Sequence, residues 1–324
     1  MSHTILVTGA AGYIGSIATE ILLQEGYNVI ALDDLSTGHK LALFDSVPFY
    51  NTSFGNIDEL KNIFSQNKID VVLHFAGVSL VSESMENPFK YFNINFCQAQ
   101  NLLHVMILSN IQKIVFSSSA AVYGIPKPKE SPIKESTQTK PINPYGESKL
   151  LFEKSLEWYK KSAGLDYISL RYFNVAGASK NRGERHNPET HLIPLVIKAI
   201  KNKNYEFNIY GNDYPTKDGT AIRDYIHVVD LVYAHILAIK ALITNKNHKK
   251  VYNIGYGHGS SVLEIVNSVQ EVFKTKISYK ISQKRSGDPP ILIADPTRIK
   301  EDLNWKPKFD DINEMIRSSS KFIE

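Results

Sequence analysis

Tyr145 and Lys149 are the residues whose types and spacing best fit a chemical step. Positions i and i+4 of a helix share one face, so the phenol and the ammonium are expected to face the same space. A free tyrosine has a pKa of about 10, and a nearby positive charge lowers it by stabilising the phenolate. Lowering that pKa to about 7 takes about 4 kcal/mol, of which one lysine supplies a part. The pair therefore predicts a tyrosine that exchanges a proton with a hydroxyl group.

A second pair in the chain, Tyr123 and Lys127, has the same spacing and serves as an internal comparison. Pro126 lies between its members, and a proline breaks a helix, so these two side chains are not expected on one face. Tyr145 instead follows Pro144, which a first helical turn tolerates, and precedes a long run with helical periodicity. Only Tyr145 and Lys149 are expected to act.

The elements that must position this pair alternate between short apolar strands and amphipathic helices. Continuous apolar runs of this length are typical of a parallel sheet covered on both faces, and repeated β-α-β units predict a doubly wound α/β fold of the Rossmann type. The expected strands are 5–7, 29–32, 71–75, 114–116 and 167–171, and the expected helices are 14–24, 57–66, 88–108 and 145–162.

The pattern changes after residue 174, where a polar, glycine-containing stretch follows. We expect a smaller mixed α/β region there, with helices at 192–201, 228–242, 262–273 and 310–320 and a strand at 207–210. The predicted domains are 1–175 for a dinucleotide and 176–324 for a substrate, with a soft boundary across which segments can interleave.

Composition places the chain among ordinary globular proteins, with 43% hydrophobic and 22% charged residues in 324. A single cysteine excludes an internal disulfide, and Cys97 lies in an apolar helical run that predicts a buried thiol. His186 and His191 flank a proline rather than sharing a helix face, so no metal site is predicted. The mild net charge of +4 and the lack of long apolar stretches or a signal region favour a cytoplasmic protein that binds neither nucleic acid nor membrane.

Three glycines, Gly9, Gly12 and Gly15, lie between the first expected strand and the first expected helix. Glycines at this position permit a tight turn and let backbone approach a pyrophosphate at a helix N-terminus. Asp33 ends the second expected strand, where a carboxylate accepts from a ribose 2′-hydroxyl and repels a 2′-phosphate. With Asp34 beside it, the sequence predicts NAD rather than NADP.

The chain resembles the extended short-chain dehydrogenase/reductase family, and within it the branch that epimerises nucleotide sugars at C4. The resemblance runs nearly end to end. It is carried by TGAAGYIG at 8–15, LDDLSTG at 32–38, HFAG at 74–77, FSSSAAVYG at 116–124, PYGESK at 144–149, LRYFNVAGA at 170–178, YGNDYPTKDGTAIRDYIHVVDL at 210–231, NIGYG at 253–257, RSGDPP at 285–290 and LNW at 303–305.

The resemblance implies a reversible C4 epimerisation of UDP-galactose and UDP-glucose through a transient 4-keto sugar, with tightly bound NAD, in galactose metabolism. It implies that Ser119, Tyr145 and Lys149 are catalytic. The implied cofactor contacts are Gly9, Gly12, Tyr13, Ile14, Gly15, Asp33, Asp34, Leu35, Ser36, Asn56, Ile57, Phe75, Ala76, Gly77, Asn95, Tyr145, Lys149 and Phe173. The implied contacts of the UDP-hexose are Ser119, Asn174, Leu192, Asn208, Tyr210, Arg223, Arg285, Asp288 and Leu292.

Some positions depart from the pattern of the family. Asn56 stands where many relatives carry aspartate, and Ser79 stands where some carry lysine, so both cofactor contacts are open. Asp288 is expected to bond a ribose hydroxyl or to orient Arg285, and Arg223 to bind diphosphate unless it pairs with Asp224. Leu292 aligns with a position that gates acetamido sugars.

Other functions share this machinery. UDP-N-acetylhexosamines or UDP-pentoses are alternative substrates. A nucleotide-sugar 4,6-dehydratase needs an Asp-Glu pair after the catalytic hydroxyl, where this chain has Ala120 and Ala121. A non-catalytic NAD-binding regulator typically lacks the tyrosine or the lysine. The family also implies a homodimer, in which the helices near 88–108 and 145–162 pair between subunits unless these faces belong to the core of one chain.

Overall fold

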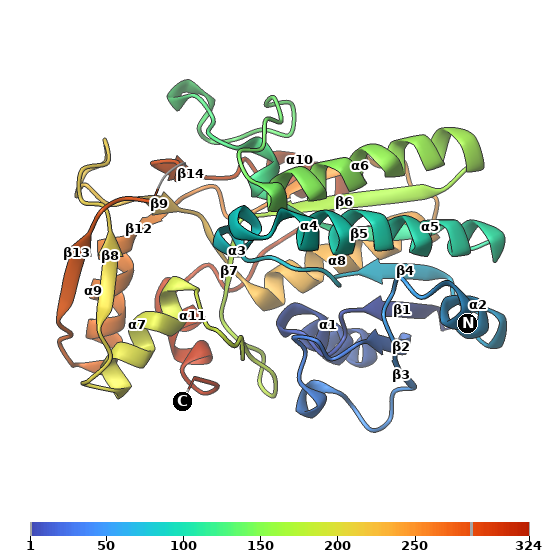
Figure 1. Ribbon diagram of the computed structural model, residues 1–324, viewed down its shortest axis with the longest axis horizontal. Helices are drawn as coiled ribbons and strands as arrows, with labels where there is room; N and C mark the ends of the chain where they lie inside the picture. The colour runs from blue at the N-terminus through green and yellow to red at the C-terminus, as the bar shows by residue number, and fades with distance from the viewer. Residues whose placement is uncertain (1, 286–287, 324) are drawn as a thin grey trace.

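The computed structural model describes residues 2–285 and 288–323 and is built around one parallel sheet (Figure 1). The sheet has seven strands, and each strand pairs in parallel with the strands beside it. In spatial order they are β11 (Val251–Ile254), β6 (Asp166–Tyr172), β5 (Lys113–Ser119), β4 (Val71–His74), β1 (Thr4–Thr8), β2 (Asn28–Asp33) and β3 (Phe49–Asn51). The chain order reverses between β1 and β4, and this is the position at which such sheets bind ligands.

Helices cover both faces of the sheet, as alternation of side chains requires. Ile5 and Val7 face one hydrophobic cluster, together with α1 (Tyr13–Gln24) and α8 (Val228–Ile243). Leu6 faces the other cluster, which is closed by α2, α5 and α6. The bounds of these three helices are Ile57–Gln66, Ala99–Leu108 and Pro144–Ala163. The predicted doubly wound α/β fold is confirmed.

The segment predicted as one helix over 88–108 is divided into three parts. It begins with α4 (Pro88–Phe92), continues through the π-helical turn η2 (Asn93–Gln98), and ends as α5. Cys97 lies on η2 and is exposed, so the expectation of a buried thiol is wrong. The π turn rotates the helix face, which apolar periodicity alone did not reveal. The short helix α3 (Val81–Glu86) precedes this segment.

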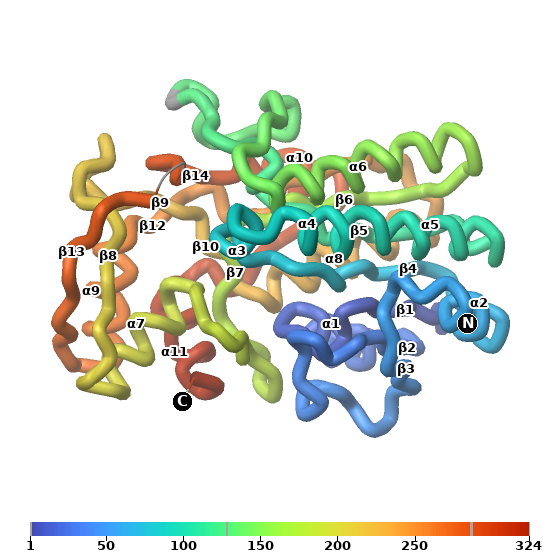
Figure 2. Tube along the Cα trace, viewed as in Figure 1, coloured from blue at the N-terminus to red at the C-terminus, as the bar shows by residue number. Residues whose placement is uncertain are grey.

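Short strands and helices form a second region beside the carboxyl edge of the sheet, at the left of Figures 1 and 2. Its small sheets pair β7 with β10, β8 with β13, and β9 with both β12 and β14. These strands are β7 (Asn174–Ala176), β8 (Phe207–Tyr210), β9 (Ile222–Arg223), β10 (Tyr225–His227), β12 (Ser260–Ser261), β13 (Tyr279–Ser282) and β14 (Ile291–Leu292). The helices of this region are α7 (Leu192–Lys201), α9 (Val262–Phe273) and α11 (Ile312–Ser319), whereas α10 (Thr297–Leu303) packs on β11 and α8 at the main sheet. The 3₁₀ turns among the described residues are η1 (Lys40–Ala42), η3 (Ala120–Tyr123) and η4 (Pro128–Glu130).

The chain crosses between the two regions more than once. Strand β11 and helix α8 follow residue 175 in sequence, yet β11 pairs with β6 and α8 packs on β5 and β6. The two regions therefore share one continuous core. Among the described residues, no helix is long and apolar enough to cross a membrane.

Candidate active site

The predicted site residues gather at the carboxyl ends of β1, β4 and β5. The Gly9 turn follows β1, the backbone of Phe75 and Ala76 follows β4, and Ser119 ends β5. Phe75 N and Ala76 N donate to Thr8 O at 3.1 and 3.2 Å, which locks the turn after β4 against the end of β1. Parallel strands bring these turns together even though more than a hundred residues separate them in sequence.

The glycine loop is packed too closely to admit a side chain. A Cβ at Gly15 would lie 2.0 Å from Gly9 O, and a Cβ at Gly9 would lie 2.7 Å from Ala76 N. Gly9 also has a φ of 74°, which favours glycine. Helix α1 begins directly after Gly12, so its free N–H groups point toward the loop. This cradle fits the pyrophosphate of a dinucleotide.

Asp33 lies at the end of β2, where the adenosine half of a dinucleotide is expected. Its two carboxylate oxygens accept from Ala11 N at 2.9 Å and from Leu35 N at 2.8 Å. Burial raises the pKa of Asp33, and these two backbone donors oppose that shift. Asp34 accepts from Ser36 N, so the acidic turn is held by its own backbone.

Asn56 has a structural role that the sequence did not predict. Its side chain accepts from Glu59 N at 3.3 Å and caps α2, of which Ile57 is the first residue. An asparagine is a good N-cap because its oxygen satisfies a free backbone donor. The predicted contact of Asn56 with adenine stays a prediction.

Gly77, in the turn after β4, lies against Asn95 of η2. A Cβ at Gly77 would lie 2.7 Å from Asn95 Oδ1 and 3.6 Å from Lys149 Nζ. Asn95 accepts from Val78 N and donates to Val78 O, both at 2.9 Å, and it also donates to Ser148 Oγ at 3.1 Å. The π turn η2 therefore ties the strand end of β4 to α6. Gly77, Asn95 and Lys149 form one contiguous group, and their predicted contact with the cofactor stays a prediction.

Helix α6 positions the tyrosine and the lysine. It begins at Pro144, and Asn143 caps it by accepting from Gly146 N at 2.8 Å. Tyr145 and Lys149 are both buried and lie one turn apart on this helix. Gly146 lets the helix approach η3 closely, since a Cβ there would lie 2.5 Å from Ala121 O. This close contact brings the start of α6 beside Ser119.

The pKa of Tyr145 differs from the initial expectation. Burial raises it above its ordinary value, and contact with the Ser119 hydroxyl partly opposes the shift. Lys149 is not among the groups that lower this pKa in the arrangement described, and the lowering expected from its charge together with a nicotinamide ring stays a prediction. The Ser119 hydroxyl also accepts from Ala121 N at 3.1 Å, which orients it as the cap of η3.

Lys149 points into the sheet edge rather than into solvent. Its Nζ donates to Ser117 O at 3.0 Å and lies 5.0 Å from the centre of the Phe116 ring. Burial lowers the pKa of Lys149 to about 8, while the charge of Glu153 opposes the shift. Burial, followed by the charge of Lys149, also lowers the pKa of His74 to about 3. The site therefore holds a neutral imidazole beneath one ammonium.

Sequence reasoning missed the buried groups that support this site. Glu153 Oε1 accepts from Ser118 Oγ at 2.5 Å and from Arg171 Nε at 2.9 Å. Arg171 Nη1 also donates to the hydroxyl of Tyr123 at 3.0 Å. A signal for Glu153 was present in the sequence, because it follows Lys149 by four residues and shares its helix face. Tyr123, the tyrosine of the comparison pair, is a member of this structural network.

The predicted substrate residues of the second region lie on short strands, in the segment between β13 and β14, and at the start of α7. Arg223 Nη2 lies 2.5 Å from Asp288 Oδ1, so Arg223 pairs with Asp288 rather than with Asp224. Arg285 instead lies over the Tyr210 ring, 4.3 Å from its centre, and this differs from the expectation that Asp288 orients it. Ser286 and Gly287 of the 285–290 motif lie outside the described residues.

Two of the predicted substrate residues are asparagines that lie in separate small sheets. Asn208 Oδ1 accepts from Ser282 Oγ at 3.1 Å across the β8–β13 pair. Asn174 N donates to Asp224 O at 2.9 Å where β7 begins. Leu192 is the first residue of α7.

Leu292 lies between the two regions. It pairs in register with Arg223 in the β9–β14 sheet. Its side chain is partly buried against a small apolar cluster that contains Phe173 and Ala120. Leu292 therefore connects the arginine of the second region with the turn that follows Ser119.

Comparisons with known proteins agree with this geometry. Residues 5–255 match the NAD dependent epimerase/dehydratase family. A UDP-glucose 4-epimerase from Lacticaseibacillus casei is 46% identical over 318 residues, covering 98% of this chain and 95% of its own.

Solved structures are similar over the same length. The crystal structure of UDP-glucose 4-epimerase from Brucella ovis in complex with NAD has a TM-score of 0.95 and 38% identity, covering 99% of this chain and 98% of its own. The enzyme from Bifidobacterium longum in complex with NAD⁺ and UDP has a TM-score of 0.90 and 37% identity, covering 98% and 97%.

Proposed function

The chain belongs to the NAD dependent epimerase/dehydratase family, and from this premise we propose that it interconverts UDP-galactose and UDP-glucose by inverting C4 of the hexose. NAD is the cofactor, and it stays bound through the cycle. The observation that carries the proposal is the meeting of Ser119, Tyr145 and Lys149 beside a glycine loop that admits no side chain.

The reaction is a reversible oxidation followed by a reduction. Bound NAD supplies a hydride acceptor that becomes the hydride donor for the return step. Tyr145 takes the proton from the 4-hydroxyl as the hydride leaves C4, and Ser119 holds that hydroxyl in line with the phenol. The 4-keto sugar then presents its opposite face, and Tyr145 returns the proton as the hydride comes back. Atoms and electrons balance, so no other oxidant or reductant is consumed.

Lys149 has two tasks in this account. Its ammonium supplies positive charge beside the cofactor ribose, at the position where Gly77 and Asn95 meet. That charge favours the phenolate of Tyr145 once the positive nicotinamide ring is also close. Burial of Tyr145 excludes water, which strengthens both interactions.

The UDP moiety is proposed to bind the second region. Arg223 and Arg285 are the cations there, and a guanidinium donates two parallel hydrogen bonds to a diphosphate. Tyr210 is 42% exposed, so it is an accessible ring rather than a core residue. Asn174, Leu192, Asn208 and Asp288 complete the proposed contacts. A remote anchor of this kind leaves the hexose free to turn between the two half-reactions.

Residues at a few positions distinguish the proposed function from the alternative functions. Ala120 and Ala121 begin η3 directly after Ser119, so the acid and base of a 4,6-dehydratase are absent there. A non-catalytic regulator does not explain why the tyrosine and the lysine are both retained and buried. UDP-N-acetylhexosamines and UDP-pentoses use the same chemistry, and Leu292 is the residue proposed to limit acetamido groups.

We also propose a cytoplasmic homodimer that acts in galactose metabolism. Large apolar side chains are exposed at Phe89, Leu108 and Trp158 on the helices predicted to pair, and at Val81 and Met85 on the preceding helix α3. Helices α4 and α5 both contact α6, so the exposed groups lie on neighbouring helices. Burial of such a surface between two subunits is favourable, and light scattering of the purified protein tests it.

The substrate is tested by incubating the protein separately with UDP-galactose and with UDP-N-acetylgalactosamine and resolving the products by chromatography. We expect UDP-glucose from the first substrate and a slower conversion of the second. Absence of C4 inversion with both sugars contradicts the proposed function.

A further inference from the structure

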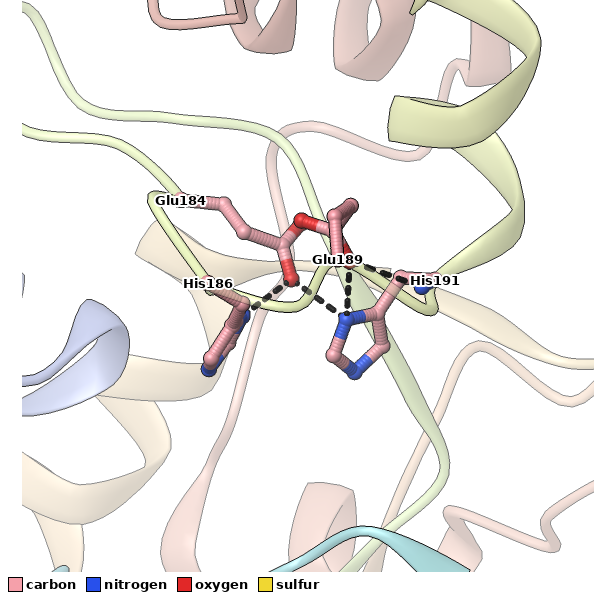
Figure 3. Close-up of side chains that lie close together, drawn as sticks. All are labelled: Glu184, His186, Glu189 and His191. Carbon is pink, nitrogen blue, oxygen red and sulfur yellow. Dashed lines mark hydrogen bonds and ion pairs between the residues drawn. The ribbon is translucent and has the colours of Figure 1, made fainter. Parts of the chain in front are cut away.

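A cluster of two glutamates and two histidines lies in the loop between β7 and α7, outside the catalytic group. Glu184, His186, Glu189 and His191 each offer one ligand atom, and these four atoms lie within 4.8 Å of one another. Figure 3 shows both histidine rings directed toward the same oxygen of Glu184, with Glu189 beside His191. All four groups come from eight consecutive residues, so the loop itself builds the cluster.

The contacts within the cluster are close. Glu184 Oε1 lies 2.8 Å from His186 Nδ1 and 2.7 Å from His191 Nδ1. Glu189 Oε1 lies 2.8 Å from His191 Nδ1. The side chain of Glu184 is only 3% exposed, so its carboxylate is removed from water.

The two carboxylates face the two histidines. Over the described ranges 2–285 and 288–323, the only ion-pair partners of Glu184 and Glu189 are the two histidines, with no lysine or arginine among them. Although burial opposes it, the charges of Glu184 and Glu189 raise the pKa of His191 to about 10, so a proton on His191 supplies the counter-charge when no metal is bound. A divalent cation would neutralise both carboxylates at once and would take the lone pair of each imidazole Nδ1.

We propose that Glu184, His186, Glu189 and His191 form a binding site for a first-row divalent metal ion of the Zn²⁺ class. Two imidazole nitrogens and two carboxylate oxygens are donors that Zn²⁺ accepts, and it is four-coordinate in most structural sites. Bonds of about 2.0–2.1 Å place neighbouring tetrahedral ligands about 3.3 Å apart. Three of the separations in the cluster are 2.7–2.8 Å and all lie within 4.8 Å, so side-chain rotations would place the four atoms around one ion.

The position of the cluster indicates what a bound ion would do. Arg182 Nε donates to Ala42 O at 3.1 Å, and the His39 ring lies 2.6 Å from Arg185 O. The His186 ring meets the Tyr13 ring edge to face at 6.1 Å between centres. The loop thus already spans from α1 to the segment near residue 40. A metal ion would cross-link residues 184–191 of the loop and so stabilise its contacts with α1 and with the segment near residue 40.

The test is a Zn²⁺ titration of the untagged full chain after treatment with a chelator, followed by calorimetry and metal analysis. The wild-type protein is expected to retain one Zn²⁺ per chain that His186→Asn and Glu189→Gln each lose, with the dissociation constant raised at least about tenfold. His258→Asn is the matched control, because His258 also contacts a carboxylate, Asp310 Oδ1 at 2.8 Å, and forms an ion pair with no other carboxylate in the described part of the chain. This control is expected to keep the bound ion.

Thermal unfolding gives a second readout that does not depend on activity. Zn²⁺ is expected to raise the melting temperature of the wild-type protein and of His258→Asn, and to leave that of His186→Asn and Glu189→Gln unchanged. Because the His186 and Glu189 side chains differ in solvent exposure, a folding defect in one variant leaves the other to test the proposal. Absence of a bound equivalent in the wild-type protein, or equal binding by the cluster variants, overturns the proposal.

Discussion

The cofactor side of the site consists of closely packed backbone, whereas the substrate side consists of contacts between side chains. On the cofactor side, backbone meets backbone, since a Cβ at Gly15 would lie 2.0 Å from Gly9 O. On the substrate side, long side chains are in contact with one another, because Arg223 pairs with Asp288 and Arg285 lies over the Tyr210 ring. The first arrangement has one conformation, whereas the second can adjust by rotation of side chains. This difference fits a cofactor that stays bound and a hexose that must rotate to present its opposite face.

The largest expected effect comes from disturbing the backbone cradle. Gly15→Ala places a Cβ against Gly9 O, so the loop must open and the pyrophosphate loses its donors. We expect NAD to bind at least about 10²-fold more weakly, because a displacement of about 1 Å has this cost. The measurement is the NAD content of the purified protein and its dissociation constant by titration.

Gly26→Ala is the matched control for this change. A Cβ at Gly26 meets nothing within 4 Å, although its φ of 80° also favours glycine. The control is expected to lose some stability and to retain NAD. Equal loss of NAD in both variants would show that the cradle has no special role.

The second expected effect concerns the adjustable side. Arg223→Leu removes a guanidinium proposed to bind diphosphate and leaves Asp288 without its partner at 2.5 Å. We expect the KM for UDP-galactose to rise about 10- to 100-fold, since a hydrogen bond to a charged group contributes about 1.5–3 kcal/mol. NAD content should be unchanged. Steady-state kinetics and NAD analysis together check this prediction.

Lys280→Met is the control on the same side, because Lys280 forms an exposed ion pair with Glu206. Its KM should match that of the wild-type protein. A KM for Arg223→Leu within twofold of the wild-type value would remove Arg223 from the proposed anchor.

The third effect is a pH dependence of stability on the cofactor side. Burial lowers the pKa of Lys149 to about 8, whereas an unfolded lysine titrates at about 10.4. The unfolded chain therefore binds more protons between these values, and the contribution of Lys149 to the unfolding free energy rises with pH across that window. Relative to Lys149→Met, the wild-type protein should gain about 3 kcal/mol between pH 8 and 10.4.

Chemical denaturation of both proteins across this pH range measures the difference. A difference that stays constant with pH would mean that Lys149 keeps its ordinary pKa in the folded protein.

The same contrast explains what the sequence could predict. Strands such as β1 and β5 are continuous apolar runs, and their positions were predicted because burial on both faces leaves that pattern. Strand β11 was not predicted, because the buried Asn253 interrupts it, and this side chain bonds Ile133 O and the Tyr123 hydroxyl. Such partners are 120 and 130 residues away, which no local pattern reports.

For the site residues too, local features could be predicted and contacts between distant residues could not. The glycine loop and the Tyr145–Lys149 spacing are local, so their chemistry could be inferred from a few consecutive residues. The partner of Arg223 could not, because Asp288 lies 65 positions later and the adjacent Asp224 was an equally reasonable candidate. Asp224 instead accepts from Tyr256 N and Gly257 N. The pKa of Tyr145 also depends on burial, which spacing alone does not reveal.

The most direct test of the account is the turnover of Tyr145→Phe with UDP-galactose, measured on protein whose NAD content is known. We predict that turnover falls about 10³-fold or more while bound NAD persists, because the phenol moves a proton but does not hold the cofactor alone. Tyr123→Phe, from the pair with the same spacing, should keep turnover within about tenfold of the wild-type value, as loss of one buried hydrogen bond affects mainly stability. Wild-type turnover in NAD-loaded Tyr145→Phe would contradict the central claim.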